Sequence, residues 1–452
     1  MTSFTNRLQN AIPGGAHTYS KGSDQFPSNA PQILEKGQGA YVYDPDGRKF
    51  LDFGMGLRSV LIGYSESEIN DAAISYLKRG MNLTRPSVIE LEAAEQMIDL
   101  IPSADMVKFT KNGSTAVTAA VKLARAYTGR NLVAICSDHP FFSYDDWFIG
   151  TTPMSKGIPS ETSNLTKAFK YNDISSIENL ISQYPNEIAC VVLEPLASDC
   201  PTVSLSKGGC CGEKICNRLQ DREGNFLHQV QALCKKNGIV FILDEMITGF
   251  RWGLGGAQEA FKLTPDLSTF GKAIANGFPL ACVVGKREIM SLGSIENQGQ
   301  ERLFLVSTTH GGDMASLGAF MGTVNFIKRE PVVQHVWDFG FNLISVMNKS
   351  AKAHGLEGYF KVLGPACSPR FITLDKDMNN SLEFRTLFVQ ELINNKILMP
   401  WISIAYRHSN SMIAEIELAL NSVFNLYSKA LESSPKNFVK GSLIKPVFRK
   451  LN

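Results

Sequence analysis

The residues of this chain best placed to do chemistry are an acidic residue and a lysine, each following an apolar segment. Asp244 ends the run Phe241-Ile-Leu-Asp, and Lys272 follows Thr269-Phe-Gly. A buried carboxylate can keep a heterocyclic nitrogen protonated, and a lysine with a lowered pKa can bind an aldehyde and then move a proton. Taken singly, each residue has a simpler interpretation, because an aspartate often ends a strand and a lysine is usually a solvated charge.

Together, the two groups are those that pyridoxal phosphate requires. This cofactor stabilises a substrate carbanion only while its ring nitrogen is protonated, and an amine must hold its aldehyde carbon. We therefore predict pyridoxal 5'-phosphate as the cofactor. Lys272 is the predicted covalent anchor and catalytic acid/base, and Asp244 is the predicted partner of the ring nitrogen.

A phosphate site is predicted at the start of an alanine-rich helix. Gly113, Ser114 and Thr115 would place free backbone N–H groups, the positive end of the helix dipole and two hydroxyls around one anion. The hydroxyls could also be ordinary N-caps. Phe141 offers a ring that could stack on a pyridine ring, with core packing as the alternative.

A further hydroxyl group lies in the segment Thr308-Thr-His-Gly-Gly312. Its two glycines would allow the backbone to approach an anion closely. An ordinary turn between a strand and a helix explains this segment equally well. We keep Thr308 as a candidate phosphate ligand.

Composition describes an ordinary globular protein. The 452 residues are 44% hydrophobic and 19% charged, and the formal net charge of +2 gives no argument for nucleic acid as a partner. The first residues lack the apolar core of a signal peptide, and no run reaches membrane-spanning length. We expect a cytoplasmic protein that binds no membrane.

Four of the nine cysteines lie close together in a loop that contains glycine and lysine. Their spacing has no paired C-x-x-C knuckles, so we expect free thiols rather than a structural zinc site, and no metal is predicted. The four are Cys200, Cys210, Cys211 and Cys216.

Short apolar runs alternate with helical segments through the middle of the chain. They are Leu132 to Cys136, Ile188 to Leu193, Ile239 to Leu243 and Leu280 to Val284. Continuous apolar runs separated by helices favour a mainly parallel sheet that is covered on both faces. Sites in such sheets lie at the carboxyl ends of the strands, where Glu194 and Asp244 both fall.

The remaining sequence suggests the domain boundaries. Tyr41-Val-Tyr43 and Phe50-Leu-Asp-Phe53 flank an Asp-Gly step, which predicts a small antiparallel sheet. A capping-box pattern at Ser87 and Glu90 predicts a helix that ends near residue 100. Longer helices then surround one strand at 371–374, and an amphipathic helix spans about 410–431. We expect an N-terminal segment 1–60, a large cofactor-binding domain 61–328 and a small C-terminal domain 329–452.

The order of these motifs resembles that of class III aminotransferases, most closely the glutamate-1-semialdehyde 2,1-aminomutases and their relatives. The resemblance runs from about residue 7 to about residue 425. Its most specific parts are the segments around Asp244 and Lys272. It implies fold type I, an α/β architecture with a mainly parallel seven-stranded sheet in a large domain and a small α+β domain. It also implies a homodimer with shared active sites. The other matching segments are Ile12-Pro-Gly-Gly15, Tyr41 to Phe53, Gly113-Ser-Thr115, Leu193-Glu-Pro195 and Thr308 to Gly312.

The same resemblance implies roles for single residues. Ser114 and Thr115 would hold the phosphate, and Thr308 would reach the phosphate of the neighbouring subunit. Met246 would pack on one face of the cofactor ring, where the family usually has Val. Phe141 stands where a stacking Tyr is common, and Phe142 replaces the usual His.

Departures from the family pattern concern the substrate. Lys21 stands where the aminomutases have an arginine that grips the substrate carboxylate, and a lysine lacks the bidentate fork. Leu57 and Arg58 replace a Trp-Gly pair that lines the pocket, although Arg58 could be a surface residue. Trp401 and His408 could form pocket walls, with core packing as the alternative. Glu194 completes the set of candidate substrate-binding residues.

We therefore expect an aminotransferase that works by a ping-pong cycle between an amino acid donor and an aldehyde or ketone acceptor, with a sugar-derived acceptor as one candidate. A 2,1-aminomutase is the alternative, and it would need a lid to retain its intermediate, for which the segment 150–163 is available. A non-catalytic scaffold that binds the cofactor is the alternative of another class. No glycine-rich fingerprint supports a dinucleotide-binding oxidoreductase.

Overall fold

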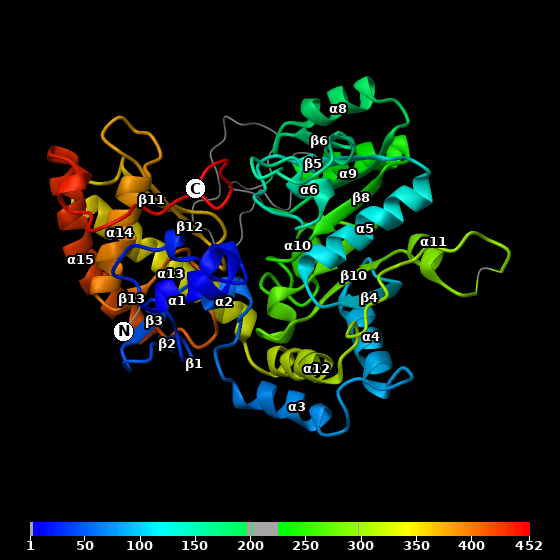
Figure 1. Ribbon diagram of the computed structural model, residues 1–452, viewed down its shortest axis with the longest axis horizontal. Coiled ribbons are helices and arrows are strands. Elements are labelled where there is room, and N and C mark those ends of the chain that lie inside the picture. Colours follow the sequence, from blue (N-terminus) through cyan, green and yellow to red (C-terminus); the bar gives the residue numbers. More distant parts are fainter. Residues whose placement is uncertain (1–2, 197–200, 202–224, 297) are drawn as a thin grey trace. The chain divides into compact units, whose positions relative to one another are not determined.

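A computed structural model describes residues 3–196, 201, 225–296 and 298–452 (Figure 1). The loop cysteines Cys200, Cys210, Cys211 and Cys216 lie outside these residues. Every cysteine within them is a buried free thiol: Cys136, Cys190, Cys234, Cys282 and Cys367. In this described part of the chain, no helix is long and apolar enough to cross a membrane.

The chain divides into two compact units. The first unit combines the described residues of Met1–Glu66 with Gln334–Asn452. The second combines the described residues of Ser67–Gly209 with those of Ile215–Val333. The first unit is therefore built from both ends of the chain.

A seven-stranded sheet forms the centre of the second unit (Figure 1), in the order β4-β10-β9-β8-β7-β5-β6. Neighbouring strands from β9 to β6 pair in parallel, whereas β10 is antiparallel to both β9 and β4. The predicted mainly parallel sheet is thus confirmed. The strands are β4 (Met106–Thr110), β5 (Leu132–Cys136), β6 (Thr166–Phe169), β7 (Ile188–Leu193), β8 (Val240–Asp244), β9 (Leu267–Phe270) and β10 (Ala281–Gly285).

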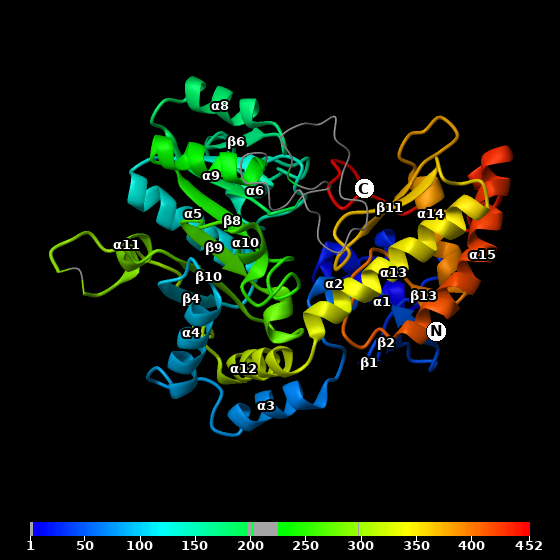
Figure 2. The ribbon, with the colours of Figure 1, turned by 180° about the vertical axis from the view of Figure 1, so that it is seen from behind.

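The second unit also contains helices α3 to α12. The helix predicted after residue 87 is α4, which begins with a capping box of Ser87 and Glu90 and ends at Leu100. The N-terminal helix of the unit, α3, lies beside its last helix, α12, as both Figure 1 and the opposite view in Figure 2 show. The helices are α3 (Ser67–Leu77), α4 (Val88–Leu100), α5 (Gly113–Thr128), α6 (Asp146–Ile149), α7 (Ser160–Ser163), α8 (Ile174–Gln183), α9 (Phe226–Asn237), α10 (Gly256–Phe261), α11 (Arg287–Met290) and α12 (Met314–Arg329).

The first unit contains the small sheet expected near the N-terminus, and β13 extends it. Strands β1 (Lys36–Gln38), β2 (Tyr41–Tyr43) and β3 (Lys49–Asp52) form an antiparallel meander, and β13 (Ile397–Leu398) joins β3 in parallel. The predicted amphipathic helix is α15 (Asn410–Glu432). The other elements are α1 (Phe4–Ala11), α2 (Met55–Arg58), α13 (Val332–Ala353), β11 (Phe360–Leu363), β12 (Arg370–Thr373) and α14 (Leu382–Asn394).

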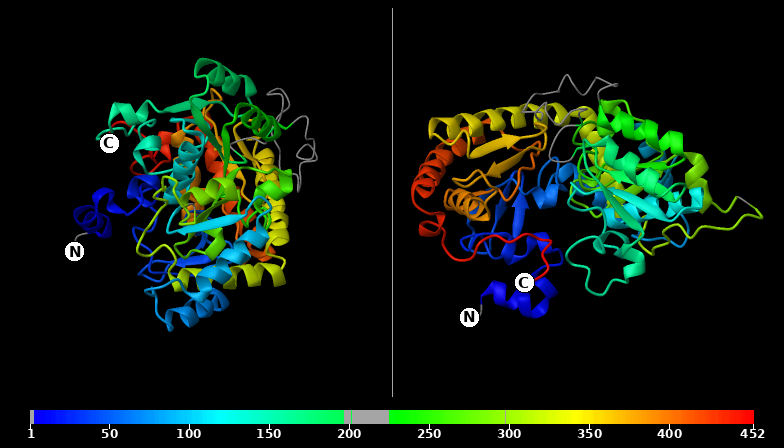
Figure 3. Two further views of the ribbon diagram at one scale, coloured as in Figure 1. Left: turned by 90° about the vertical axis from the view of Figure 1, so that its right-hand side faces the viewer. Right: turned by 90° about the horizontal axis from the view of Figure 1, so that it is seen from above.

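The two chain ends lie side by side within this unit, as the blue and red segments of Figure 3 show. Lys445 N–H donates to Asp24 O at 2.9 Å, and Arg449 forms an ion pair with the Asp24 carboxylate at 2.6 Å. The C-terminal segment is therefore attached to the N-terminal segment by backbone and side-chain contacts.

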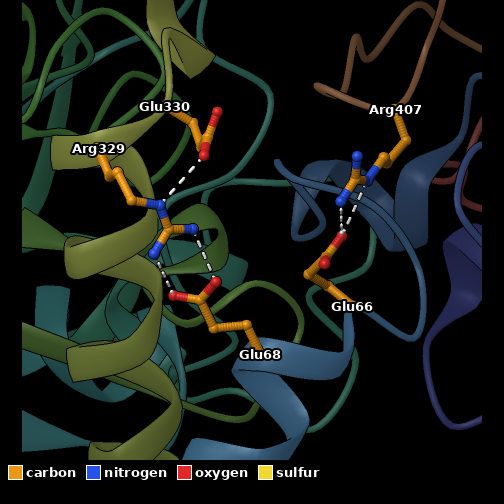
Figure 4. Close-up of polar contacts among 5 residues, drawn as sticks. All are labelled: Glu66, Glu68, Arg329, Glu330 and Arg407. Atoms are coloured by element: carbon orange, nitrogen blue, oxygen red, sulfur yellow. Dashed lines mark hydrogen bonds and ion pairs between the residues drawn. The ribbon is translucent and has the colours of Figure 1, made fainter.

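Two arginines form ion pairs close to the positions in the chain where the first unit ends and the second begins (Figure 4). Within the first unit, Arg407 binds the Glu66 carboxylate at 2.8 Å. Within the second, Arg329 at the end of α12 donates two hydrogen bonds to Glu68 at the start of α3, at 3.0 and 2.7 Å. The bidentate geometry makes this pair more specific than a single contact. Glu66 and Glu68, which lie on either side of the boundary between the units, are thus each held by an arginine of their own unit.

Candidate active site

Asp244 and Lys272 come from neighbouring strands of the second unit. β8 ends at Asp244, which is in parallel register with Thr269 of β9. Lys272 begins the 3-10 helix Lys272–Ala275 just beyond β9. Burial raises the pKa of Asp244 to about 6, against the attraction of Lys272 and two hydrogen bonds. The residues paired by sequence reasoning therefore lie within electrostatic reach of each other.

The two oxygens of the Asp244 carboxylate differ in their hydrogen bonds. Its Oδ1 accepts hydrogen bonds from Met246 N–H at 2.9 Å and from the Thr269 hydroxyl at 3.0 Å. Its Oδ2 accepts none from any residue that the structure describes. The side chain is 3% exposed. A buried carboxylate oriented by two donors, with one oxygen open, fits a protonated ring nitrogen.

Glu245, the next residue, has the opposite environment. Its carboxylate accepts hydrogen bonds from the Thr248 hydroxyl, from Ala257 N–H at 2.8 Å and from Gln258 N–H at 2.7 Å. Both of its oxygens are thus used within the protein. Glu245 holds the loop between β8 and α10 in place, which leaves Asp244 as the carboxylate available to a cofactor.

Lys272 has a strained backbone. Its φ of 48° lies in the left-handed region, which a residue with a Cβ adopts at a cost of roughly 1–3 kcal/mol. Strain of this kind persists only where the surrounding structure determines the conformation, and it concentrates at functional sites. The strained position coincides with the lysine that sequence reasoning selected.

The start of α5 provides donors for a phosphate. Asn112 caps the helix, and its Oδ1 accepts from both the N–H and the hydroxyl of Thr115, at 2.9 and 3.0 Å. No hydrogen bond to a described residue uses the N–H groups of Gly113 and Ser114. The Ser114 oxygen accepts from Tyr144 N–H at 3.1 Å, which leaves its O–H free to donate. The arrangement fits an anion.

Met246 connects this helix start to the lysine. A Cβ at Gly113 would lie 2.7 Å from the Met246 sulfur, and a Cβ at Gly271 would lie 2.6 Å from it. Both distances are too short for a real contact, so a side chain at either position would require Met246 to move. The thioether is buried and packs with Ala116 and Ala281. Met246 is therefore packed between Gly113, one of the predicted phosphate donors, and Gly271, the residue before Lys272.

The two aromatic residues of the predicted stacking segment differ in burial. Phe141 is 43% exposed, and its ring meets Phe148 edge to face at 5.7 Å. Phe142 is buried against Phe148 and His139. Of the two rings, Phe141 is therefore the one that a ligand could contact.

His139 was missed by the sequence reasoning. Its Nδ1 accepts a hydrogen bond from Glu194 N–H at 3.0 Å, which places the ring proton on Nε2. Burial lowers the pKa of His139 to about 3, so the ring stays neutral. Nε2 is buried without a hydrogen-bond partner, as befits a site that a ligand or water completes. The available signal was a histidine three residues after the end of the buried strand β5.

Thr308 lies on the surface of the second unit. It is exposed, and its carbonyl accepts from Gly311 N–H at 3.3 Å. The neighbouring Thr309 carbonyl accepts from the Asn82 side chain at 2.9 Å, which fixes the loop. Thr308 therefore belongs to an ordered and accessible segment.

Of the five candidate substrate residues, Glu194 belongs to the second unit, and the other four belong to the first: Lys21, Arg58, Trp401 and His408. Trp401 donates its indole N–H to Gly54 O at 3.0 Å, and the Arg58 guanidinium lies 6.0 Å from the Trp401 ring. Lys21 and Trp401 line a cavity of about 810 Å³, together with Leu57. The structure thus brings three of these candidates together, Arg58 through its contact with Trp401.

His408 is part of the core of the first unit. It is fully buried, its Nδ1 accepts from Ala405 N–H at 2.9 Å, and its Nε2 lies 3.1 Å from Asp52 O. Its ring stacks on Phe53 at 4.5 Å. Because both nitrogens bind backbone atoms, the structure favours the core-packing interpretation over a pocket wall.

The segment between β3 and Val60 has an unusual backbone. Four consecutive residues, Met55 to Arg58, have φ between 41° and 65°. This is a left-handed turn, which costs each residue with a Cβ roughly 1–2 kcal/mol. Asp52 stabilises the turn by accepting from Gly54 N–H at 2.8 Å and from Met55 N–H at 3.0 Å, and the Tyr64 hydroxyl also donates to Asp52 at 2.7 Å. The turn is therefore firmly held.

Comparisons with known proteins agree on one family. The family model described as aminotransferase class-III matches residues 23–364. Over 370 residues the chain is 29% identical to a glutamate-1-semialdehyde 2,1-aminomutase of Francisella philomiragia subsp. philomiragia, with 80% of each chain covered.

Solved structures share the fold. The pyridoxal phosphate internal aldimine form of the FumI protein of Sphingopyxis sp. MTA144 gives a TM-score of 0.81 at 22% identity, over 95% of this chain and 97% of that one. A glutamate-1-semialdehyde-aminomutase of Pseudomonas aeruginosa PAO1 gives 0.77 at 18% identity, over 93% of both chains. At these identities the likeness establishes the fold.

Proposed function

Because the chain belongs to the class III aminotransferases, which are enzymes that use pyridoxal phosphate, we propose that it moves an amino group from an amino acid to a separate aldehyde or ketone in a ping-pong cycle. The observation that carries this proposal is the buried Asp244 carboxylate, with one open oxygen, one strand away from Lys272. Adjacent strand ends bring an electron-withdrawing partner and a covalent anchor to one place.

The bound cofactor supplies an electron sink for the carbanion. Asp244 Oδ2 would keep the ring nitrogen protonated. Lys272 Nζ would hold the aldehyde carbon and, once the donor's amine has displaced it, would remove the proton from the donor's α-carbon and later return it. Phe141 and Met246 would pack on the two ring faces. Glu194, whose backbone orients His139, is proposed to contact the substrate.

For the phosphate, we propose the N–H groups of Gly113 and Ser114, the Ser114 hydroxyl and the Thr115 hydroxyl. The structure supports the first three most directly, since Asn112 already accepts a hydrogen bond from the Thr115 hydroxyl. The Ser114→Ala variant is expected to weaken binding of pyridoxal phosphate, because it removes a charge-assisted donor of about 1.5–3 kcal/mol. Binding of pyridoxal, which lacks the phosphate, should change little and serves as the control.

We further propose a homodimer in which Thr308 of each subunit binds the phosphate of the other. Five large apolar side chains between residues 77 and 91 are exposed by 43–73%, and we propose that they form part of the dimer surface. They are Leu77, Met81, Leu83, Val88 and Leu91. The double variant Val88→Asp/Leu91→Asp should dissociate the dimer in sedimentation, whereas the same change at exposed Leu418 should not.

Transfer to a separate acceptor is favoured over intramolecular transfer by the residues near the cavity. Lys21 binds a carboxylate as a point charge, and Leu57 leaves more room than a tryptophan. A sugar-derived acceptor is a candidate, supported by the flat ring of Trp401 beside polar groups. In the aminomutase alternative, the segment 150–163 would serve as the lid.

The deciding experiment mixes the cofactor-loaded enzyme with single amino acids and follows the absorbance of the cofactor. A transaminase donor converts it to the pyridoxamine form, and the converted enzyme then returns to the original spectrum with an added carbonyl compound. If no amino acid acts while a diamino acid does, the aminomutase function replaces the proposed one. If nothing acts although the cofactor is bound, the chain is a scaffold.

A further inference from the structure

An ion pair in the second unit joins two segments that carry predicted phosphate ligands. The Lys111 ammonium pairs with the Asp313 carboxylate, whose side chain is 4% exposed. Lys111 directly precedes Asn112, the N-cap of α5, where the predicted donors Gly113 to Thr115 begin. Asp313 ends the loop that begins at Thr308 and leads into α12. The pair therefore connects the start of α5 to the Thr308 loop.

Lys111 uses all three of its N–H donors in this region. Besides pairing with Asp313, its Nζ donates to Pro279 O at 3.2 Å and to the Ser316 hydroxyl at 3.4 Å. An ammonium group has three donors and no acceptor, so its hydrogen-bonding capacity is filled. Pro279 belongs to the connection between the Lys272 turn and β10. The ammonium thus joins three segments that each adjoin a predicted cofactor ligand.

Asp313 is a fixed anchor for this contact. It is the N-cap of α12, where its Oδ1 accepts from Ser316 N–H at 2.9 Å while its Oδ2 pairs with Lys111. Most residues of α12 are buried. The first residue of the helix is held as well, because Met314 N–H donates to Met81 O at 3.1 Å. Lys111 therefore binds an element whose position is determined by its own packing.

The ion pair is better suited to fixing a geometry than to adding charge. The pair is neutral overall, and the loss of hydration offsets much of the attraction within a buried pair. A site whose donors come from separate segments binds its ligand tightly only if these segments are held within about 0.5 Å of the productive geometry. A lysine with three used donors restrains the segments in this way.

We propose that Lys111 is a positioning residue for the cofactor phosphate. Through Asp313 it holds the loop of Thr308 in a fixed relation to the donors at the start of α5, and it does not itself contact the phosphate. The inference rests on the proposed function, in which these groups bind the phosphate. It adds a residue that the sequence motifs did not indicate.

The test uses the double variant Lys111→Met/Asp313→Asn, which removes both charges and so leaves neither of them buried and unpaired. Asparagine keeps the N-cap of α12. Fluorescence titration of the apoprotein is done at pH 7, because burial lowers the pKa of Lys111 to about 8 and the ammonium is still charged there. The Kd for pyridoxal phosphate should rise roughly tenfold, as for the loss of one charge-assisted hydrogen bond. The Kd for pyridoxal, which has no phosphate, should stay within about twofold of the wild-type value.

The variant Thr308→Ala separates positioning from other effects of the double variant. If Lys111 acts through Thr308, the double variant should weaken binding of pyridoxal phosphate no further in a Thr308→Ala background, because the donor that it positions is gone. Additive effects on the Kd would overturn the proposal. They would show that the pair acts on the phosphate by its charges or through a general loss of structure.

The matched control is Lys286→Met/Asp266→Asn, which removes another lysine–aspartate ion pair of the same unit. Asp266 accepts from Phe241 N–H at 2.8 Å, near the start of β8, whereas Asp244 lies at the end of that strand. The control pair is therefore at the opposite edge of the sheet. It should keep the wild-type Kd for pyridoxal phosphate, and an equal loss in the control would overturn the proposal.

Ser114→Ala is measured first on the wild-type background. If it does not weaken binding of pyridoxal phosphate, the phosphate site of the proposed function fails. If it does, but the Lys111→Met/Asp313→Asn variant stays within about twofold of the wild type, the positioning role alone is overturned. A variant that binds pyridoxal phosphate and pyridoxal equally more weakly would also overturn it, since the loss would then not concern the phosphate.

Discussion

Replacing Asp244 by asparagine should stabilise the apoprotein and weaken cofactor binding. Burial raises the pKa of Asp244 from 3.8 to about 6. At about 1.4 kcal/mol per pKa unit, the folded apoprotein loses about 3 kcal/mol by keeping this group ionised. For a carboxyl with a raised pKa, that loss appears as the pH rises from about 4 to 6 and is complete above it. The amide of the variant would avoid the loss while its oxygen still accepts from Met246 and Thr269.

Cofactor binding should respond in the opposite direction. Lys272 and two hydrogen bonds offset only part of the cost of burying the ionised Asp244, and pairing with a protonated ring nitrogen would offset the rest. Removing one partner of a buried ion pair costs about 3–5 kcal/mol, and 3 kcal/mol corresponds to roughly a 150-fold weaker Kd for pyridoxal phosphate. Thermal unfolding of the apoprotein at pH 7.5 and fluorescence titration with the cofactor measure the two effects.

Glu245→Gln is the matched control, since this neighbouring carboxylate is equally buried. Its oxygens accept from Thr248, Ala257 and Gln258, so the amide would lose acceptors and destabilise the apoprotein by about 1–3 kcal/mol. Its Kd for the cofactor should stay close to that of the wild type. The reasoning is refuted if Asp244→Asn lowers the unfolding temperature of the apoprotein, or if its Kd stays within threefold of the wild type.

Three further predictions concern the same site. Lys272→Ala should bind the cofactor without a borohydride-reducible bond and should lose proton transfer at the donor's α-carbon; retention of the bond, seen by mass after reduction, would exclude Lys272 as the anchor. Cofactor affinity of the wild type should rise from pH 5 to pH 7, because the carboxylate form of Asp244 binds it; Asp244→Asn should keep only the dependence due to the phosphate, and equal slopes would argue against the assignment. Gly271→Ala should destabilise the protein by about 1–3 kcal/mol through overlap with the Met246 sulfur, and Met246→Val should recover most of this in a urea titration; additive effects would mean that the contact is not the cause.

The central sheet and the main site could be predicted because their signals are local. Each strand of a parallel sheet is covered on both faces, so its sequence is one continuous apolar run. Sites in such sheets form at the carboxyl ends of the strands, so the end of each run predicts where a site residue lies. Asp244 was placed by this rule. The antiparallel direction of β10 could not be read in the same way, because a buried apolar run carries no sign of its direction.

Other features depend on contacts between distant residues. The sequence Met-Gly-Leu-Arg at 55–58 contains a single glycine and gives no sign of a left-handed turn, which Asp52 and other nearby donors and acceptors impose. No local pattern separates a buried His408 from a pocket residue, because its partners, Phe53 and Asp52 O, lie about 350 positions away in the sequence. The pairing of β13 with β3 joins segments that no local pattern connects.

The pairing of β13 with β3, and the nearby bond from Trp401 to Gly54, affect how the chain can fold during synthesis. The Trp401 indole and the Gly54 carbonyl that it binds are 347 positions apart. At roughly 5–20 residues per second, synthesis between them takes on the order of 20–70 s. During that time the second unit can fold, while β3 exposes the edge that β13 later covers. A ribosome-bound chain that stops before residue 397 should therefore be protected from protease in the second unit and remain cleavable in the first, and this exposed edge is where aggregation would begin.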